Sequence, residues 1–242
     1  MVGNILSLCY EYVAPMHSRQ LSLSFVNARS KCRRGAVPAR GHVPHRVRPA
    51  HGSRHPVHVT FRRARHLPSL RAQSLFLSLQ RALSRTARSW FRVVQFSVQA
   101  DHVHLLVEAL DKGALSRGMT GLLVRLARAF NRALGRRGGV WSGRFHSRAL
   151  RTPREVRNGL VYVLMNHRKH AAPGDSRAMN GLDACSSAVW FEGWAGPPSP
   201  GPPLSWHDPP VALSETWLAR IGWKRHGLIR FDESPKGSRT VR

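Results

Sequence analysis

Cysteine is rare in this chain of 242 residues, and long apolar runs are missing. Cys9, Cys32 and Cys185 lie far apart and form no C-x-x-C pair, which argues against a zinc ribbon and against a disulfide framework. No apolar run approaches the roughly 18 residues that a membrane-spanning helix needs, so no membrane partner is expected. The start, residues 1–13, contains Glu11 and lacks a basic region, so it does not resemble a signal peptide. The cytoplasm is the expected compartment.

Acidic residues are also few, with 12 Asp and Glu against 39 Lys and Arg, a formal net charge of +27. Such a charge attracts polyanions and supplies the part of nucleic-acid binding that does not depend on sequence. Arginine far outnumbers lysine, which suits bidentate contacts with phosphate. Nucleic acid is therefore the expected partner, with an anionic membrane or a ribosome-type scaffold as alternatives. Seven of the twelve acidic residues lie from Asp175 onward, so this end is a poorer candidate for holding DNA.

Composition divides the chain into three parts. Residues 1–52 become rich in Arg, Pro, Gly and His and predict a basic, poorly ordered arm. Residues 53–172 carry regular periodicity and predict the folded domain. Residues 173–242 combine a Pro-rich linker with a C-terminal segment that contains one short capped helix. We expect that helix to pack on the core through three apolar residues, Trp217, Leu218 and Ile221.

Alternating apolar residues and capping signals predict seven elements in the middle part. They are a strand at 57–62, a helix at 68–85, strands at 91–98 and 101–108, a helix at 115–134, a strand at 145–150 and a helix at 152–169. The order strand, helix, hairpin, helix, strand predicts an α+β fold with a ferredoxin-like antiparallel sheet and helices on one face. The additional last helix is then free to cover the other face.

His102 and His104 stand in the most informative stretch of the sequence. Val103, Leu105 and Val107 alternate with the histidines and predict a strand with one apolar face. Two histidines separated by one residue leave the same face of a sheet, with Cβ atoms about 6–7 Å apart, so one cation can bridge both rings. By itself such a pair is more often two partly buried histidines than a metal site.

The predicted last helix adds Tyr162, the only tyrosine after Tyr12, and Asn166. A separation of four residues puts both side chains on one helical face. From the helix alone a core tyrosine is the simpler interpretation. Together with His102 and His104, however, Asn166 offers a third neutral ligand for a divalent ion, and the phenol would stand beside that ion. A phenol has a pKa near 10. A nearby cation favours the phenolate and polarises a phosphate oxygen. The predicted reaction is attack by Tyr162 on a DNA phosphate, which leaves a 5′-phosphotyrosine and a free 3′-hydroxyl.

The sequence resembles a known family in two stretches, His102-Val103-His104-Leu105-Leu106-Val107 and Tyr162-Val163-Leu164-Met165-Asn166. It is similar to the single-tyrosine HUH transposases, and among them to the REP-associated tyrosine transposases of bacteria. The resemblance covers residues 53–172, with the His-Pro-Val-His-Val opening at 55–59 and Arg144-Phe145-His146. It extends to Ser186-Ser187 and Trp190-Phe191-Glu192-Gly193-Trp194 in the tail.

By resemblance, His102, His104 and Asn166 would bind Mg²⁺ or Mn²⁺, and Tyr162 would be the nucleophile. The relatives cleave and rejoin single-stranded DNA near hairpin-forming repeats. Two imidazoles suit Mn²⁺ better than Mg²⁺, whereas abundance favours Mg²⁺ in the cell. This chain departs from the family pattern at Asp101, where members commonly have Asn, and at His167, where many have Pro. Asp101 either joins the metal shell or caps the turn, and the turn is the preferred interpretation.

Two other phosphate-processing enzymes each lack a required residue. A histidine-triad hydrolase needs a third histidine at Leu106, and a two-histidine phosphoesterase needs a second copy of the His58-Val59-Thr60 motif. His55 and His58 fall on opposite faces of a strand and are interpreted as structural or phosphate-contacting. A different class stays open, namely a domesticated or decayed protein that binds hairpin DNA without cutting it.

For DNA binding, the basic residues nearest the predicted site are candidates, and we expect fewer than half of them to contact DNA. The candidates are Arg62, Arg63, Arg65, Arg144, Arg148, Arg151, Arg154, Arg157, Arg168 and Lys169. Phe145 or Trp141 could stack on a base, although core packing is the preferred interpretation of each. Whether the protein is a monomer or a homodimer stays open.

Overall fold

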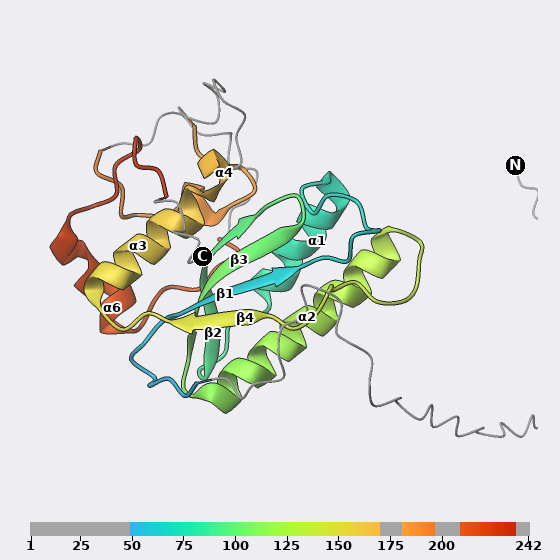
Figure 1. Ribbon diagram of the computed structural model, residues 1–242, viewed down its shortest axis with the longest axis horizontal. Coiled ribbons are helices and arrows are strands. Elements are labelled where there is room, and N and C mark those ends of the chain that lie inside the picture. Colours follow the sequence, from blue (N-terminus) through green and yellow to red (C-terminus); the bar gives the residue numbers. More distant parts are fainter. Residues whose placement is uncertain (1–48, 170–180, 197–208, 236–242) are drawn as a thin grey trace, which may run out of the picture. The chain divides into compact units, whose positions relative to one another are not determined.

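Alternation of apolar and polar residues along four segments produces a four-stranded sheet (Figure 1). The computed structural model describes residues 49–169, 181–196 and 209–235. The strands are β1 (Val57–Arg62), β2 (Phe91–Val98), β3 (His102–Ala109) and β4 (His146–Ala149). Their order is β2-β3-β1-β4 and every neighbouring pair is antiparallel. The predicted α+β, ferredoxin-like sheet is confirmed. The predicted linker around 197–208 lies outside the described residues, as does the predicted arm except for its last four residues.

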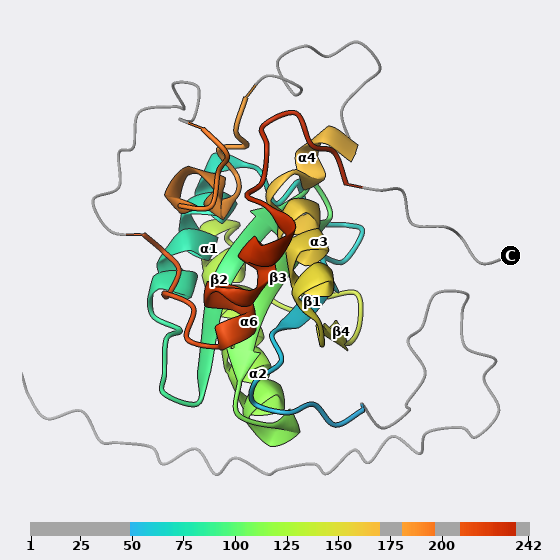
Figure 2. The same cartoon turned by 90° about the vertical axis from the view of Figure 1, so that its left-hand side faces the viewer.

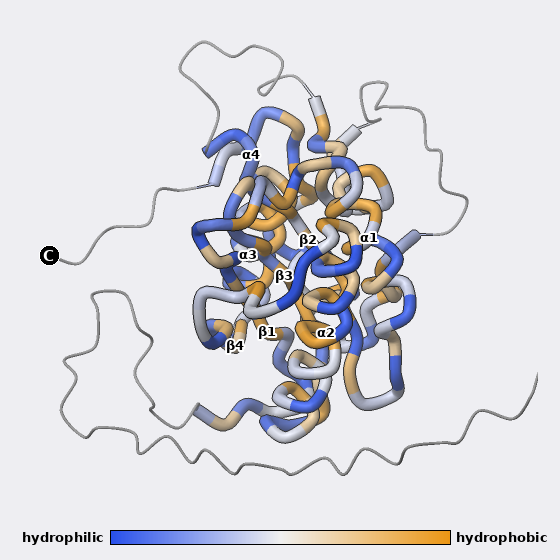
Figure 3. Tube along the Cα trace, turned by 90° about the vertical axis from the view of Figure 1, so that its right-hand side faces the viewer, coloured by the Kyte–Doolittle hydropathy of each residue, from blue (hydrophilic) through white to orange (hydrophobic). Residues whose placement is uncertain are grey.

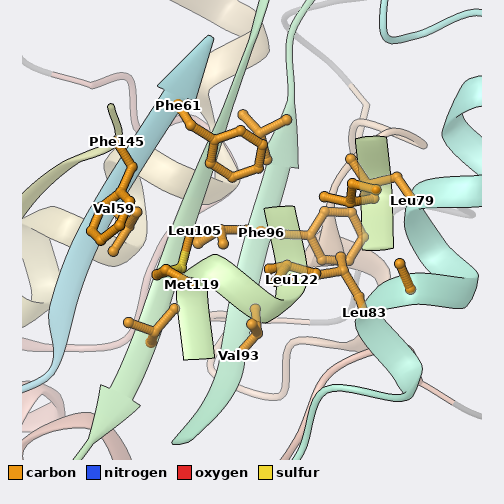
Figure 4. Packing of buried hydrophobic residues seen from close by; sticks show 14 of the residues in the cluster. Val59, Phe61, Leu79, Leu83, Val93, Phe96, Leu105, Met119, Leu122 and Phe145 are labelled. Atoms are coloured by element: carbon orange, nitrogen blue, oxygen red, sulfur yellow. The ribbon is translucent and has the colours of Figure 1, made fainter. Parts of the chain in front are cut away.

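Two helices cover the first face of the sheet, α1 (Gln73–Ser84) and α2 (Lys112–Ala133). The core beneath them is built from the odd-numbered residues of β1 and β3, among them Val59, Phe61 and Leu105 (Figure 4). Figure 3 faces these two helices and shows hydrophobic and hydrophilic residues alternating along both. α2 begins three residues earlier than predicted, because the side chain of Asp111 accepts a hydrogen bond from the backbone N–H of Ala114.

The opposite face is covered by α3 (Pro153–Leu164), which packs on Val94 and Leu106 (Figure 2). Its start follows the predicted capping box: Thr152 accepts from the N–H of Glu155, and the Glu155 carboxylate accepts from the N–H of Arg151. The predicted continuous helix to residue 169 is wrong, because α3 ends before Met165.

A separate short helix, α4 (Asn166–Lys169), follows that break. Asn166 therefore opens a new helix and does not stand one turn after Tyr162 on an unbroken one.

The segment 181–196 covers the outer edge of β2. The N–H of Val98 donates to the carbonyl of Cys185, and the N–H of Phe96 donates to Oγ of Ser187, at the start of the 3₁₀ helix η1 (Ser187–Trp190). Asp183 of this segment accepts two hydrogen bonds from the guanidinium of Arg71, at 2.7 and 2.9 Å, and this bidentate pair fixes the segment to the domain. The contacts satisfy backbone groups that an open sheet edge would leave unpaired.

A second C-terminal segment forms α6 (Trp217–Arg220) and the 3₁₀ helix η2 (Gly222–His226). Its anchor is Glu108 of β3, whose buried carboxylate accepts hydrogen bonds from both backbone N–H groups of Glu215 and Thr216 and from the Thr216 hydroxyl. Burial raises the pKa of Glu108 and outweighs the hydrogen bonds of Thr216 and the charge of Arg92, which lower it. These contacts fix the N-cap residue of α6, Thr216, and the residue before it, and the Thr216 hydroxyl accepts a hydrogen bond from the N–H of Ala219 in the helix.

The docking residues of this segment differ from those predicted. Leu218 is buried as expected, but Trp217 and Ile221 are exposed, at 47% and 52%. Trp223 at 2% and Ala219 provide the buried contacts instead. The difference arises because Ile221 ends the α-helix and the chain continues as a 3₁₀ helix, which turns Trp223 towards α3.

Gly118 and Gly121 of α2 form a matched pair for a test of packing. A Cβ at Gly118 would stand 2.2 Å from the ring of Phe91, whereas a Cβ at Gly121 would meet nothing within 4 Å. We expect Gly118→Ala to lower the free energy of unfolding by about 1–3 kcal/mol, since the Phe91 ring must move. Gly121→Ala should raise it by about 0.5–1 kcal/mol through helix propensity. Urea denaturation of both variants measures the difference, and equal effects would contradict the described packing of α2 on β2.

Candidate functional site

The even-numbered residues of β3 face α3, and along the strand they pass from two histidines through a leucine to a glutamate. Glu108 anchors α6, Leu106 belongs to the apolar core under α3, and His104 and His102 occupy the remaining end. All are buried, His102 at 6% and His104 at 3% exposed. The two histidines therefore project from one face into the layer that α3 covers, as their spacing predicts.

The rings of both histidines and of Tyr162 lie together. The ring centroids of His102 and His104 are 4.7 Å apart, and those of His104 and Tyr162 are 5.0 Å apart with the rings nearly perpendicular. Residues separated by nearly sixty positions in the chain thus meet because α3 crosses the open face of the sheet. This juxtaposition is the central requirement of the predicted site.

Each histidine ring is held through the same nitrogen, Nδ1. Nδ1 of His102 lies 2.5 Å from Oδ1 of Asp101, whose other oxygen pairs with Arg62 at 3.0 Å. Nδ1 of His104 lies 3.0 Å from the hydroxyl of Thr60, its neighbour across the β1–β3 ladder. These contacts make Nε2 the candidate ligand atom of both rings.

The carboxylate of Asp101 holds the imidazole of His102, a contact that neither predicted role included. Burial would raise the pKa of Asp101, but the hydrogen bond and charge of His102 and the charge of Arg62 outweigh burial and lower it. The group is therefore a carboxylate that orients a ring.

Asn166 is the third predicted ligand and is completely buried. Its amide Oδ1 and Nδ2 have no hydrogen-bond partner among the described residues. A buried amide without a partner is costly, so its presence calls for an explanation such as a bound ion. An amide oxygen and two imidazole nitrogens are donor types that suit a divalent metal ion, and the convergence of Asn166 with His102 and His104 on one ion stays a prediction. No group of three or more His, Cys, Asp and Glu side chains in the described part forms a candidate metal site by itself.

His58 is a site residue that the sequence interpretation missed. Its ring stacks on His104 at 5.2 Å, its Nε2 lies 3.2 Å from Nδ1 of His104, and its ring meets the Tyr162 ring edge-on at 5.5 Å. Burial, with a smaller contribution from Arg148, lowers the pKa of His58 to about 4, so the ring is neutral at neutral pH. The sequence shows which residues of β1 share one face of the sheet, but it does not show that β1 pairs with β3.

A cavity of about 680 Å³ opens beside Tyr162, between α3, β4 and the segment 226–235. His58 and Tyr162 line one part of it, and Arg148 and Arg154 line another. Lys169 of α4 places its ammonium 5.3 Å from the centroid of the Tyr162 ring. The lining also includes Arg157 and the carboxylates of Glu155 and Glu233, so the cavity walls carry three arginines and two carboxylates. The excess of positive charge suits a phosphodiester.

The predicted DNA-binding residues fall into two groups. Five are exposed near the site, and two of these each pair with one carboxylate, Arg62 with Asp101 and Arg148 with Glu155. The five are Arg62, Arg148, Arg151, Arg154 and Lys169. Arg65 and Arg144 are exposed as well. The other group is used within the protein. Arg63 donates to three backbone carbonyls, and Arg157 forms a bidentate pair with Glu233 and donates to the carbonyls of Gly227 and Leu228.

Three more residues that were considered for DNA contact are packed within the protein. Arg168 is buried and donates to the carbonyl of Glu233. Phe145 is buried, and Trp141 is half-buried with its indole N–H donating to the carbonyl of Leu123. The preferred interpretation of both aromatic residues as core agrees with this packing.

A ferredoxin-like sheet that carries two oriented histidines, under a helix that brings one tyrosine against them, defines a candidate nuclease site. Residues 53–154 match the family model described as "Transposase IS200 like". Over these residues the chain is similar to the IS200-like transposases, a family whose members are HUH tyrosine nucleases and typically use a divalent metal. The match includes His102 and His104 and ends before Tyr162 and Asn166.

A solved structure of a REP-associated tyrosine transposase bound to a REP hairpin is also similar to this chain. The identity is 17%, the TM-score is 0.48, and the similarity covers 61% of this chain and 84% of the other. A sequence comparison with curated proteins gives no match. In the described part of the chain, no helix has both the length and the apolar character that crossing a membrane would require.

Proposed function

We propose that the protein is a metal-dependent endonuclease and strand transferase that acts on single-stranded, hairpin-forming DNA. The Tyr162 hydroxyl oxygen attacks a phosphodiester phosphorus, an O–P bond forms to the tyrosine, and the bond from phosphorus to the 3′ oxygen breaks. The phenol loses its proton and the leaving 3′ oxygen gains one. The product is a 5′-phosphotyrosine with a free 3′-hydroxyl, and attack by a 3′-hydroxyl reverses the step.

The observation that carries this proposal is the contact of the Tyr162 ring with the His104 ring, which in turn contacts the His102 ring, on the face of the sheet that α3 covers. A tyrosine that merely completed a core would not need two imidazoles oriented through Nδ1 beside its ring. The match of residues 53–154 to the IS200-like transposase model supports the same reaction class.

The residues that would hold Mg²⁺ or Mn²⁺ are His102 and His104 through Nε2 and Asn166 through Oδ1. Such an ion supplies Lewis acidity to the phosphate and favours the phenolate. The protein's own contribution is to orient the rings, through Asp101 and Thr60, and to hold the Tyr162 ring against His58 and His104. Orientation of this kind lowers the entropic part of the barrier.

DNA is proposed to lie along the cationic cavity beside Tyr162. Exposed Arg154 and the neighbouring Lys169 are the best-placed phosphate contacts, followed by Arg148, whose exposed guanidinium pairs with Glu155 at 2.8 Å. Arg157, Arg168 and Arg63 are poorer ones, since their guanidinium groups already bind carbonyls or a carboxylate of the protein. Hairpin-forming repeats like those of the REP-associated relatives are the proposed substrate, as the sequence resemblance implies.

A labelled hairpin oligonucleotide with a single-stranded flank tests the reaction. With Mn²⁺ we expect cleavage of the flank and a covalent adduct that survives denaturing electrophoresis, together with a product that has a free 3′-hydroxyl. Chelation of the metal should prevent both. Retained binding without any adduct in Mn²⁺ or Mg²⁺ would favour the other class, a protein that binds hairpin DNA without cutting it.

A further inference from the structure

The face of α1 and α2 that points away from the sheet is strongly cationic. Exposed arginines follow one side of α2 and the end of α1; they are Arg81, Arg85, Arg88, Arg117, Arg125, Arg128 and Arg132. Neither helix contains an Asp or Glu. These seven residues define the arginine face. The helices α1 and α2 lie on the opposite side of the sheet from α3, the helix that carries Tyr162 (Figure 2).

No residue of the arginine face forms an ion pair within the described part of the chain. Elsewhere in the same fold the arginines are commonly neutralised, as in the pairs of Arg71 with Asp183 and of Arg157 with Glu233. The positive charge of the arginine face is therefore left for an external anion.

The arginines also converge where the two helices meet. Nη2 of Arg125 donates to Oγ1 of Thr86, which directly follows α1, at 3.1 Å. Burial and the charge of Arg88 lower the pKa of Arg125, so Arg88 and Arg125 repel each other across this junction. Two like charges held close together without a carboxylate are destabilising in the free protein, and a phosphate between them relieves the repulsion.

Along α2 the arginines form a stripe. Arg117, Arg125, Arg128 and Arg132 recur at helical spacing on one side, over a length of about 22 Å at 1.5 Å per residue. This span reaches several phosphates of a nucleic-acid backbone, which carries one charge per about 1.7 Å of duplex axis.

The chemistry of the face distinguishes duplex from single-stranded nucleic acid. Proteins that bind single strands place exposed aromatic rings for bases to stack on. The only Trp, Phe or Tyr of the described residues that is largely exposed is Trp217, on α6. Trp90 beside α2 is half-buried, with the guanidinium of Arg117 above its ring. The arginine face thus offers phosphate contacts without stacking platforms, which suits the backbone of a duplex.

We propose that the arginine face is a second DNA-binding surface, which holds double-stranded DNA through its phosphates while the Tyr162 face handles the single strand. The inference rests on the proposed function only in taking DNA as the polyanion. It needs neither cleavage nor a metal.

The test is a triple variant of the full chain, Arg125→Gln, Arg128→Gln and Arg132→Gln, since glutamine keeps the helix propensity. The matched control removes three charges from α6 and η2, with Arg220→Gln, Lys224→Gln and Arg225→Gln, all at exposed positions. Fluorescence anisotropy with a 30-base-pair duplex of arbitrary sequence, from 50 to 300 mM NaCl, gives the affinity and its salt slope. We expect the α2 triple variant to lose about 10²- to 10³-fold in duplex affinity at 0.1 M salt and about 2.7 in the slope.

The control triple variant should retain duplex affinity within a few-fold. Equal losses in both variants would overturn the proposal, since net charge alone would then explain binding. It would also be overturned if the α2 variant lost affinity for single-stranded oligo(dT) and kept its affinity for the duplex. The double variant Arg128→Gln, Arg132→Gln, which leaves the Arg125–Thr86 hydrogen bond in place, checks that a loss does not come from altered packing, and circular dichroism should be unchanged.

The cleavage assay separates this inference from the proposed function. If the unaltered protein never cleaves DNA but the α2 variant loses duplex binding, the arginine face is supported and the nuclease proposal is contradicted. If the unaltered protein cleaves DNA and the α2 variant binds the duplex as tightly as the unaltered protein does, only the proposal for the arginine face is contradicted.

Discussion

Replacement of Tyr162 by phenylalanine is expected to abolish cleavage and adduct formation while DNA affinity stays within a few-fold. Phenylalanine keeps the ring that packs against His104, His58 and Lys169 and removes only the hydroxyl. Without that oxygen no O–P bond to the protein can form, so the loss should be complete. Affinity should persist because most of it comes from the basic surface, which the substitution leaves unchanged.

The chain offers its own control for this experiment. Tyr10 and Tyr12 are the other tyrosines, and phenylalanine at either position should leave cleavage intact. Peptide mapping of the adduct should place the nucleotide on residue 162. An adduct that forms in Tyr162→Phe, or one that maps to Tyr10 or Tyr12, would remove the proposed nucleophile.

The sheet could be predicted because its strands obey a local rule. In β3 the apolar residues alternate with His102, His104 and Leu106, and burial on both sides of the strand agrees with this alternation. The capping box at Thr152 and Glu155 likewise depends on neighbours in sequence, so the start of α3 was predictable. The juxtaposition of Tyr162 with the histidines required only that α3 cross the open face.

The remaining features depend on tertiary contacts. The positions of His58 and Thr60 beside His104 follow from the β1–β3 register, which no local pattern encodes. The break at Met165 leaves α3 without its expected last turn, although the sequence there contains neither Gly nor Pro. The burial of Trp223 in place of Ile221 follows from the change from α to 3₁₀ geometry after α6. Each of these depends on a partner distant in sequence or on a helix end without a local signal.

Replacement of Asp101 by alanine is expected to weaken Mn²⁺ binding about 10- to 100-fold in the absence of DNA. The carboxylate is the described hydrogen-bond partner of Nδ1 of His102, and it selects the tautomer in which Nε2 carries the lone pair. Without it the ring can rotate and can protonate the wrong nitrogen, which costs metal affinity even though no ligand is removed. Titration of the full-length protein with Mn²⁺, followed by the electron paramagnetic resonance signal of the free ion, measures the affinity directly.

The conservative variant Asp101→Asn distinguishes orientation from charge. An amide oxygen can still accept from the Nδ1–H of His102, so this variant should retain most of the affinity. Arg62→Gln removes the other partner of Asp101 and should change the affinity little, because Arg62 does not touch the imidazole. If Asp101→Ala binds Mn²⁺ as tightly as the unaltered protein, then the His102–Asp101 pair does not orient a ligand. If Asp101→Asn is as weak as Asp101→Ala, the negative charge acts on the ion itself, and the aspartate belongs to the metal shell rather than behind it.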